Sequence, residues 1–163
     1  MRRFLISILL FLTLISFTTC YSPKEYSFVI DQSGILDNFQ RAKLDSLYYK
    51  HEKNTTNQIV LLTTDSFDRD STIESYALRK FNSIGIGRKD INNGILIVFS
   101  ASMRQVRIAT GYGTEKVLTN DIAKKIIDSL MTPRFKQEEY FDGLWNASIA
   151  ITEFLEKPEN KIK

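Results

Sequence analysis

The pattern of apolar and polar positions predicts a first helix that begins after Asp37. The Asp37 carboxylate can accept hydrogen bonds from the unpaired backbone N–H groups of a first turn, and Gln40 stands where a capping box has its second partner. An apolar face then continues to about Lys53, formed by Leu44, Leu47, Tyr48 and His51.

Three later segments repeat the helical spacing. Ser71 and Glu74 have the spacing of a capping box and open the second helix. Thr119 caps the third helix, which we expect Pro133 to stop. The fourth runs over about residues 137–155. The apolar face of the second helix is formed by Ile73, Ala77, Phe81 and Ile84. That of the third is formed by Ile122, Ala123, Ile126, Ile127 and Leu130, and that of the fourth by Tyr140, Leu144, Ala147, Ser148, Ile151 and Leu155.

Short apolar runs predict the strands. Residues 58–64 and 95–100 are β-branched and almost wholly apolar, which is typical of strands buried on both faces. Residues 105–110 alternate apolar and polar side chains, and four residues separate them from the preceding run, so this pair predicts a hairpin. Residues 22–34 form an extended lead-in. Because helices alternate with buried strands, the pattern predicts a mixed sheet covered by helices on both faces.

The first twenty residues have a different pattern. Arg2 and Arg3 precede an uncharged run from Phe4 to Phe17, and small polar residues lead to Cys20. A basic start, a short apolar core and such an exit indicate a secretion signal, because a transmembrane helix needs about 20 apolar residues. We therefore expect residues 1–20 to be a signal peptide, residues 21–156 to form one domain outside the cytoplasm, and residues 157–163 to be a charged tail.

Cys20 is the only cysteine, so the chain cannot form an internal disulfide. Its place at the end of the apolar run resembles the lipid-acceptor cysteine of bacterial lipoproteins, with Phe17 where leucine is usual and Thr19 where glycine, alanine or serine is usual. The prediction is membrane attachment in the cell envelope through a lipidated Cys20. The alternative is an ordinary cleaved signal with Cys20 near the cut.

Charge excludes one class of partner. Lys and Arg number 22 against 19 Asp and Glu, and the signal carries two of the arginines and no acid. The remaining domain is nearly neutral, so it has no electrostatic footprint for nucleic acid. We expect a monomeric domain.

The residues that could carry chemistry favour hard cations. His51 is the only histidine and no cysteine pair exists, which argues against zinc and against a Ser-His or Cys-His nucleophile pair. Carboxylates and amides are plentiful in the predicted loops and helix starts, and such oxygens suit Ca²⁺ or Mg²⁺. No stretch has the spacing of an EF-hand loop. The alternative is that these residues cap helices and keep loops soluble.

Two Gly-x-Gly pairs occur, at residues 85–87 and 111–113, and neither completes a dinucleotide fingerprint or a P-loop. Gly111 and Gly113 directly follow a predicted strand, where open α/β sheets keep their ligand crevices. We expect them to lie at a ligand-binding edge and to have a positive φ, a backbone conformation that favours glycine. The alternative is a tight strand exit packed by Tyr112.

Five segments together resemble the TPM domain family, which includes thylakoid lumen proteins of photosystem repair. They are Asp31-Gln32-Ser33-Gly34-Ile35-Leu36, Gln58-Ile59-Val60, Ile84-Gly85-Ile86-Gly87 with Asn92-Asn93-Gly94-Ile95-Leu96, Val106-Arg107-Ile108 with Gly111-Tyr112-Gly113 and Glu115, and Pro133, Phe135 and Lys136 with Tyr140, Gly143 and Leu144. The resemblance covers about residues 28–152. It implies a three-layer α/β/α sandwich, with a mixed, mainly buried sheet of about four strands, in an extracytoplasmic compartment.

The resemblance implies function more loosely, because some plant members are credited with acid phosphatase activity and some bacterial members bind calcium. Asp31, Asn93 and Glu115 fall in the motif loops, and Glu139 stands near a position where the family often has aspartate. We predict that Ca²⁺ or Mg²⁺ binds in one crevice between these three loops, with Glu139 and Asp142 completing the shell. The preferred function is an envelope module that binds this cation and a protein partner. The alternatives are a metal-assisted phosphatase for small phosphate monoesters and a scaffold without ligand.

Overall fold

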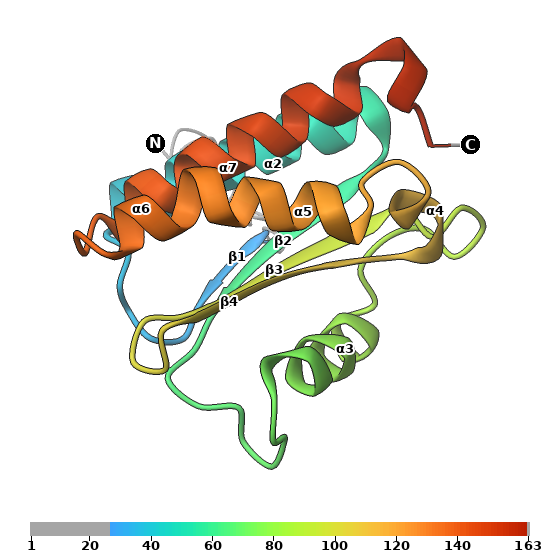
Figure 1. Ribbon diagram of the computed structural model, residues 1–163. Helices are drawn as coiled ribbons and strands as arrows, with labels where there is room; N and C mark the ends of the chain where they lie inside the picture. The colour runs from blue at the N-terminus through green and yellow to red at the C-terminus, as the bar shows by residue number, and fades with distance from the viewer. Residues whose placement is uncertain (1–26, 163) are drawn as a thin grey trace, which may run out of the picture.

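The computed structural model describes residues 27–162, so the predicted signal and Cys20 lie outside the described residues (Figure 1). Four strands form one sheet in the order β1-β2-β3-β4. The elements are β1 (Val29–Asp31), α2 (Asn38–Thr55), β2 (Gln58–Thr63), α3 (Ile73–Ile84), β3 (Gly94–Ser100), β4 (Gln105–Thr110), α4 (Tyr112–Glu115), α5 (Asn120–Ile126), η1 (Ile127–Met131), α6 (Thr132–Phe135), α7 (Tyr140–Glu156) and η2 (Pro158–Asn160).

The sheet is mixed, as predicted. β1 pairs with β2 and β2 with β3 in parallel, whereas β3 and β4 form the antiparallel hairpin. All seven residues of β3 are buried, because this strand lies between two neighbours and is covered on both faces. The lead-in contributes the short edge strand β1, which the sequence pattern indicated only as extended chain.

Helices cover both faces of the sheet, which makes three layers (Figure 1). α2, α5, α6 and α7 lie on one face and α3 on the other. Since β1, β2 and β3 follow one another in one direction across the sheet, crossovers on opposite faces have opposite hands. One of the two crossovers therefore departs from the right-handed rule for parallel strands.

The helix boundaries follow local capping chemistry. Asp37 and Gln40 form the predicted capping box of α2. The predicted box at Ser71 and Glu74 is wrong by one residue, because the Thr72 hydroxyl accepts from the Ser75 N–H at 3.2 Å and the Ser75 hydroxyl reaches back to the Thr72 N–H at 3.4 Å.

Pro133 does not stop the third helix, contrary to the prediction. A π-helical segment, η1, precedes it, and the Thr132 N–H donates to the Ile127 carbonyl. Pro133 is the second residue of α6, directly after this π-helical turn, and as a proline it donates no backbone hydrogen bond. The helical path ends only at Phe135, and α7 begins at Tyr140 instead of about residue 137.

The last described residues pack back on the domain. η2 follows α7, and the Asn160 side chain donates to the Phe154 carbonyl at 2.8 Å. Among residues 27–162, no helix has the combination of length and hydropathy that crossing a membrane requires.

Candidate functional site

The predicted site residues divide between the two ends of the sheet. Asp31 ends β1 and pairs with Thr63, which ends β2 and pairs with Phe99 near the end of β3. Gly94 begins β3 and lies beside Gln58, the first residue of β2. The Asp31 loop is therefore at the carboxyl edge of the parallel strands and Asn93 is at the opposite edge. The predicted crevice between the three loops does not form.

Strand direction explains why Gly111 and Glu115 also lie away from Asp31. β4 is antiparallel to β3, so Thr110 at its end lies beside Ile95 at the start of β3. Ligand crevices of open α/β sheets lie at the carboxyl ends of parallel strands. Gly111 and Gly113 follow the antiparallel strand, so they do not lie at the carboxyl edge on which the prediction of a ligand edge was based.

Asn93 has a structural role. It is fully buried, its Oδ1 accepts from the Arg88 N–H at 2.9 Å, and its Nδ2 donates to the Thr56 carbonyl at 2.7 Å. The Asn93 carbonyl also accepts from the Gln58 N–H at 3.2 Å. These bonds hold the loop before β3 against the end of α2, and they use the amide oxygen that the metal prediction required.

Gly111 and Gly113 are required by a close backbone approach. Neither has a positive φ, so the predicted reason is wrong. A Cβ on Gly111 would lie 2.4 Å from the Asn92 carbonyl oxygen, and a Cβ on Gly113 would lie 1.9 Å from the Ile91 carbonyl oxygen. The Gly113 N–H donates to the Asn92 carbonyl at 3.1 Å. The backbone that approaches these glycines is the chain's own loop.

Gly87, from the other Gly-x-Gly pair, lies against the same loop. Gly87 has a φ of +88°, and a Cβ there would lie 2.4 Å from the backbone nitrogen of Gly94. Its N–H donates to the Gln58 side chain at 2.7 Å. Gly87, Gly111, Gly113 and Asn93 thus form one backbone junction around the start of β3. Tyr112 is 81% exposed and does not pack this strand exit.

Glu115 and Glu139 lie at opposite edges of the sheet, and each carboxylate has a side-chain partner. The Glu115 carboxylate accepts from the Asn120 side chain at 3.2 Å. Glu139 is paired with Arg134 at 2.7 Å, and this carboxylate raises the pKa of the Arg134 guanidinium. The Tyr140 ring lies 5.4 Å from the ring of Phe99, so α7 begins over the carboxyl edge and brings Glu139 and the exposed Asp142 to the end of the sheet where Asp31 lies.

At the carboxyl edge the loops after β1 and β2 lead to opposite faces of the sheet, as they do at a topological switch point, although the strand order does not reverse here. The loop after β1 leads to α2 on one face, and the loop after β2 leads to α3 on the other (Figure 1). The Asp31 carboxylate accepts from the N–H groups of Ile35 at 3.3 Å and Leu36 at 3.0 Å, and from the Thr63 hydroxyl. Asp31 is thus held in place at the point where the two loops separate.

Hydroxyl side chains lie in the loop after β1 and at or after the ends of β2 and β3, and the sequence pattern did not single them out. The Ser33 hydroxyl oxygen is buried and has no hydrogen-bond partner among residues 27–162. The buried Thr64 and Ser100 follow or end the next two strands. The available signal was the run of Ser and Thr directly after apolar strands. Over the described residues, no three His, Cys, Asp or Glu side chains gather as a metal-binding group.

Comparison with solved structures supports the fold. The N-terminal domain of a protein from P. gingivalis, solved by NMR, is 27% identical, with a TM-score of 0.75 over 84% of this chain and 87% of that one. The N-terminal domain of the cg2496 protein from Corynebacterium glutamicum is 15% identical, with a TM-score of 0.62 over 82% and 83%. The BA42 protein from Bizionia argentinensis is 19% identical, with a TM-score of 0.60 over 73% and 83%.

Comparison at the level of sequence gives the family. No curated protein matches the chain. The family model for the TPM domain, which is named TPM phosphatase, matches residues 29–154. This range begins at β1 and ends inside α7, so it includes the whole sheet and both glycine motifs. The chain belongs to the TPM domain family.

Proposed function

We propose that this chain is a binding module of the cell envelope that holds Ca²⁺ or Mg²⁺ at the carboxyl edge of its sheet. The observation that carries the proposal is the Asp31 carboxylate, oriented by three donors where the loops to α2 and α3 separate. A carboxylate offers about four acceptor positions, so three donors leave one for a cation.

Both cations are bound by oxygen atoms, which carboxylates, hydroxyl groups, backbone carbonyls and water can supply. Calcium takes about six to eight oxygens, including carbonyls and water, and magnesium keeps several waters. A cation beside Asp31 would draw on the Ser33 hydroxyl, on loop carbonyls and on water, with Asp142 as a second carboxylate at the same end of the sheet. Asn93 and Glu115 have no part in this site because they lie at the other edge.

The test is calorimetric titration of residues 21–163, which contain the hydrophobic core found in the described residues 27–162, with calcium and then magnesium. Asp142→Asn, at an exposed position, and Asp31→Asn should each weaken binding on the order of ten-fold, because the charge of the ligand set governs affinity. Glu115→Gln removes a carboxylate at the opposite edge and should bind as the wild type does. Absence of heat and of any change in melting temperature at millimolar cation would contradict the proposal.

The envelope placement is part of the same proposal. The charged start, the apolar run and Cys20 support secretion and lipid attachment, and we extend the module's role to a protein partner in the envelope. Fatty-acid labelling in the native host should tag the wild type and leave Cys20→Ser untagged. Equal labelling of both chains would contradict attachment at Cys20.

The second candidate is a metal-assisted phosphatase, which is favoured by the name of the family model. His51 cannot serve it as an accessible base, since the ring is 1% exposed and its Nδ1 contacts Glu156 at 3.2 Å. Metal-bound water would have to attack the phosphate monoester. Hydrolysis of p-nitrophenyl phosphate that requires magnesium and is lost in Asp31→Asn would favour this function over binding alone.

A further inference from the structure

The outer face of α2 is basic and aromatic. Its exposed positions carry no carboxylate: they are Asn38, Phe39, Ala42, Lys43, Ser46, Tyr49, Lys50, Lys53 and Asn54. Phe39 is 74% exposed and Tyr49 is 54% exposed. The two acids of this helix point elsewhere, since Asp45 accepts from Ser27 and Phe28, and Glu52 accepts from Gln58.

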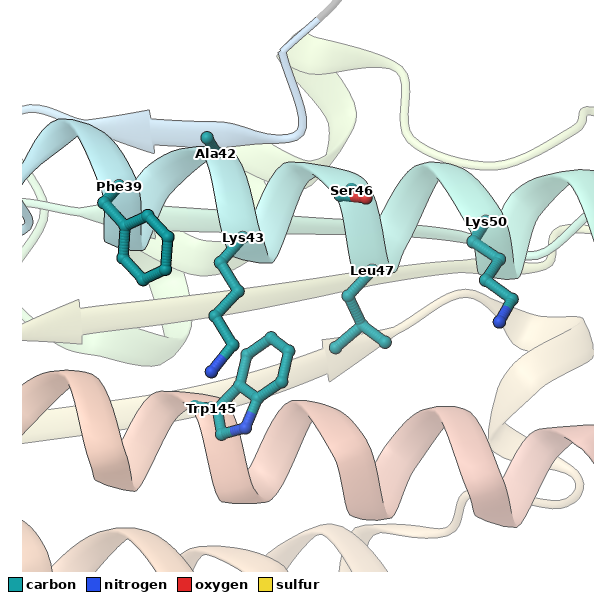
Figure 2. Close-up of a pocket in the computed structure, with 7 residues that line it drawn as sticks. All are labelled: Phe39, Ala42, Lys43, Ser46, Leu47, Lys50 and Trp145. Atoms are coloured by element: carbon teal, nitrogen blue, oxygen red, sulfur yellow. The ribbon is translucent and has the colours of Figure 1, made fainter.

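A groove runs between this face and α7 (Figure 2). Its volume is about 400 Å³, and it is lined by Phe39, Ala42, Lys43, Ser46, Leu47, Lys50 and Trp145. The Lys43 ammonium lies 4.0 Å from the centre of the Trp145 ring and 5.6 Å from that of Phe141. Two lysines and no acidic residue line the groove, so it combines apolar surface with positive charge.

We propose that this α2–α7 groove and the exposed face of α2 dock on an anionic membrane surface. Aromatic rings settle at the boundary between headgroups and acyl chains, and neighbouring lysines are attracted to anionic headgroups. Phe39 and Trp145 supply the rings, and Lys43, Lys50 and Lys53 supply the charge. This inference names the face of the proposed envelope module that meets the membrane, and it does not depend on the cation site.

The path of the chain brings this face toward a membrane-attached N-terminus. The Ser27 hydroxyl lies 3.0 Å from the Asp45 carboxylate, and the Phe28 N–H donates to the same carboxylate at 2.6 Å. The described chain therefore begins beside the middle of α2. Cys20 precedes Ser27 by seven residues, and a fully extended chain of that length reaches at most about 25 Å. A lipid on Cys20 would keep α2 within that distance of the bilayer.

The experiment uses residues 21–163, which lack Cys20, so a lipid anchor cannot produce the binding. Vesicles of phosphatidylcholine alone are compared with an equal mixture of phosphatidylcholine and phosphatidylglycerol. EDTA is present, so calcium bridging cannot produce binding and a failed cation site leaves the result unchanged. Trp145 is the only tryptophan and reports on the groove directly. We expect co-sedimentation and a blue shift of its emission with the anionic vesicles only, both reduced by salt.

Matched variants locate the contact. Lys43→Gln with Lys50→Gln should lower the partition coefficient on the order of ten-fold, and Phe39→Ser should lower it further. Arg69→Gln with Lys89→Gln removes the same charge from exposed positions in the loops before and after α3, the helix that covers the face of the sheet opposite α2, and should bind as the wild type does. Equal losses in the two double variants would overturn the proposal, as would failure of the wild type to bind anionic vesicles. A dimer in sedimentation that Phe39→Ser abolishes would assign the groove to self-association and also overturn it.

Discussion

At the scale of single residues, buried polar groups join α2 to α7. The Tyr48 hydroxyl contacts the Ser148 hydroxyl at 2.6 Å, and Ser148 donates to the Leu144 carbonyl at 2.6 Å. Burial raises the pKa of Tyr48. His51 lies one turn further along α2, and burial lowers its pKa, although Glu156 partly opposes this effect. The Tyr48–Ser148 and His51–Glu156 contacts both join α2 to α7, two helices that are distant in the sequence. The α2–α7 interface therefore contains specific polar contacts in addition to its apolar ones.

His51 predicts how stability depends on pH. Because its pKa is lower in the folded than in the unfolded chain, the unfolded chain binds the proton more readily as pH falls. Its contribution is fully present above pH about 6.5, the ordinary histidine pKa, and is lost progressively as pH falls from there through the lower pKa of the folded chain. Urea unfolding between pH 7.5 and pH 5 should show decreasing stability, and His51→Gln should reduce the decrease. The same slope in both chains would assign the effect to carboxylates.

At the scale of elements, the glycine junction determines how the hairpin joins the helices. Gly87 and Gly94 approach from the α3 side, and Gly111 and Gly113 approach from the side of β4 and α4. Each accommodates a backbone atom of a neighbouring segment. The Gly111 N–H donates to the Gly94 carbonyl at 2.9 Å, and Asn93 joins the same loop to Arg88 and Thr56. The family motifs that suggested a ligand site therefore serve chain packing at this edge.

The junction predicts a contrast between two glycine substitutions. Gly113→Ala should destabilise the domain by about 3 kcal/mol or more, because its Cβ would overlap a carbonyl oxygen that has little room to shift. Gly34→Ala should cost only about 1–2 kcal/mol, since its φ is +65° and no atom lies within 4 Å of the new Cβ. Urea unfolding measures both. Equal costs would mean that backbone conformation, and not the close approach, sets the requirement.

At the scale of the whole molecule, the two edges of the sheet differ in structure. The edge where β3 begins is closed by glycine contacts and the buried Asn93, whereas the carboxyl edge carries Asp31, separating loops and the start of α7. The proposed membrane face is a third surface, on the outside of α2. In our proposal, cation binding and membrane contact use parts of the domain that are separate from the edge where chain packing is observed.

The domain is also predicted to be stable without a covalent cross-link. The only cysteine is Cys20, and the buried core is formed by residues of the sheet and its helices. The melting temperature of residues 21–163 should be the same with and without reductant. For the chain that retains Cys20, a difference that depends on protein concentration would indicate a disulfide between two molecules.

The sequence by itself determined the local elements of this protein. Apolar periodicity placed α2, α3, α5 and α7, β-branched runs placed β2 and β3, and the capping box at Asp37 located a helix start, because each depends on neighbours within a few residues. The family also followed from short motifs. The π-helical passage before Pro133 and the one-residue shift to Thr72 could not be predicted, because the packing of each helix selects among nearly equal local arrangements.

Only the tertiary structure decided which site residues meet. Asp31, Asn93 and Glu115 all lie in loops next to strands, and local pattern does not say at which end of the sheet each loop emerges. Long-range pairing decides this: β1, β2 and β3 are parallel and β4 is not, so Asp31 is separated from the other two. The same holds for the α2–α7 groove, whose surface exists only because two helices that are remote in sequence pack side by side, as the Tyr48–Ser148 contact records.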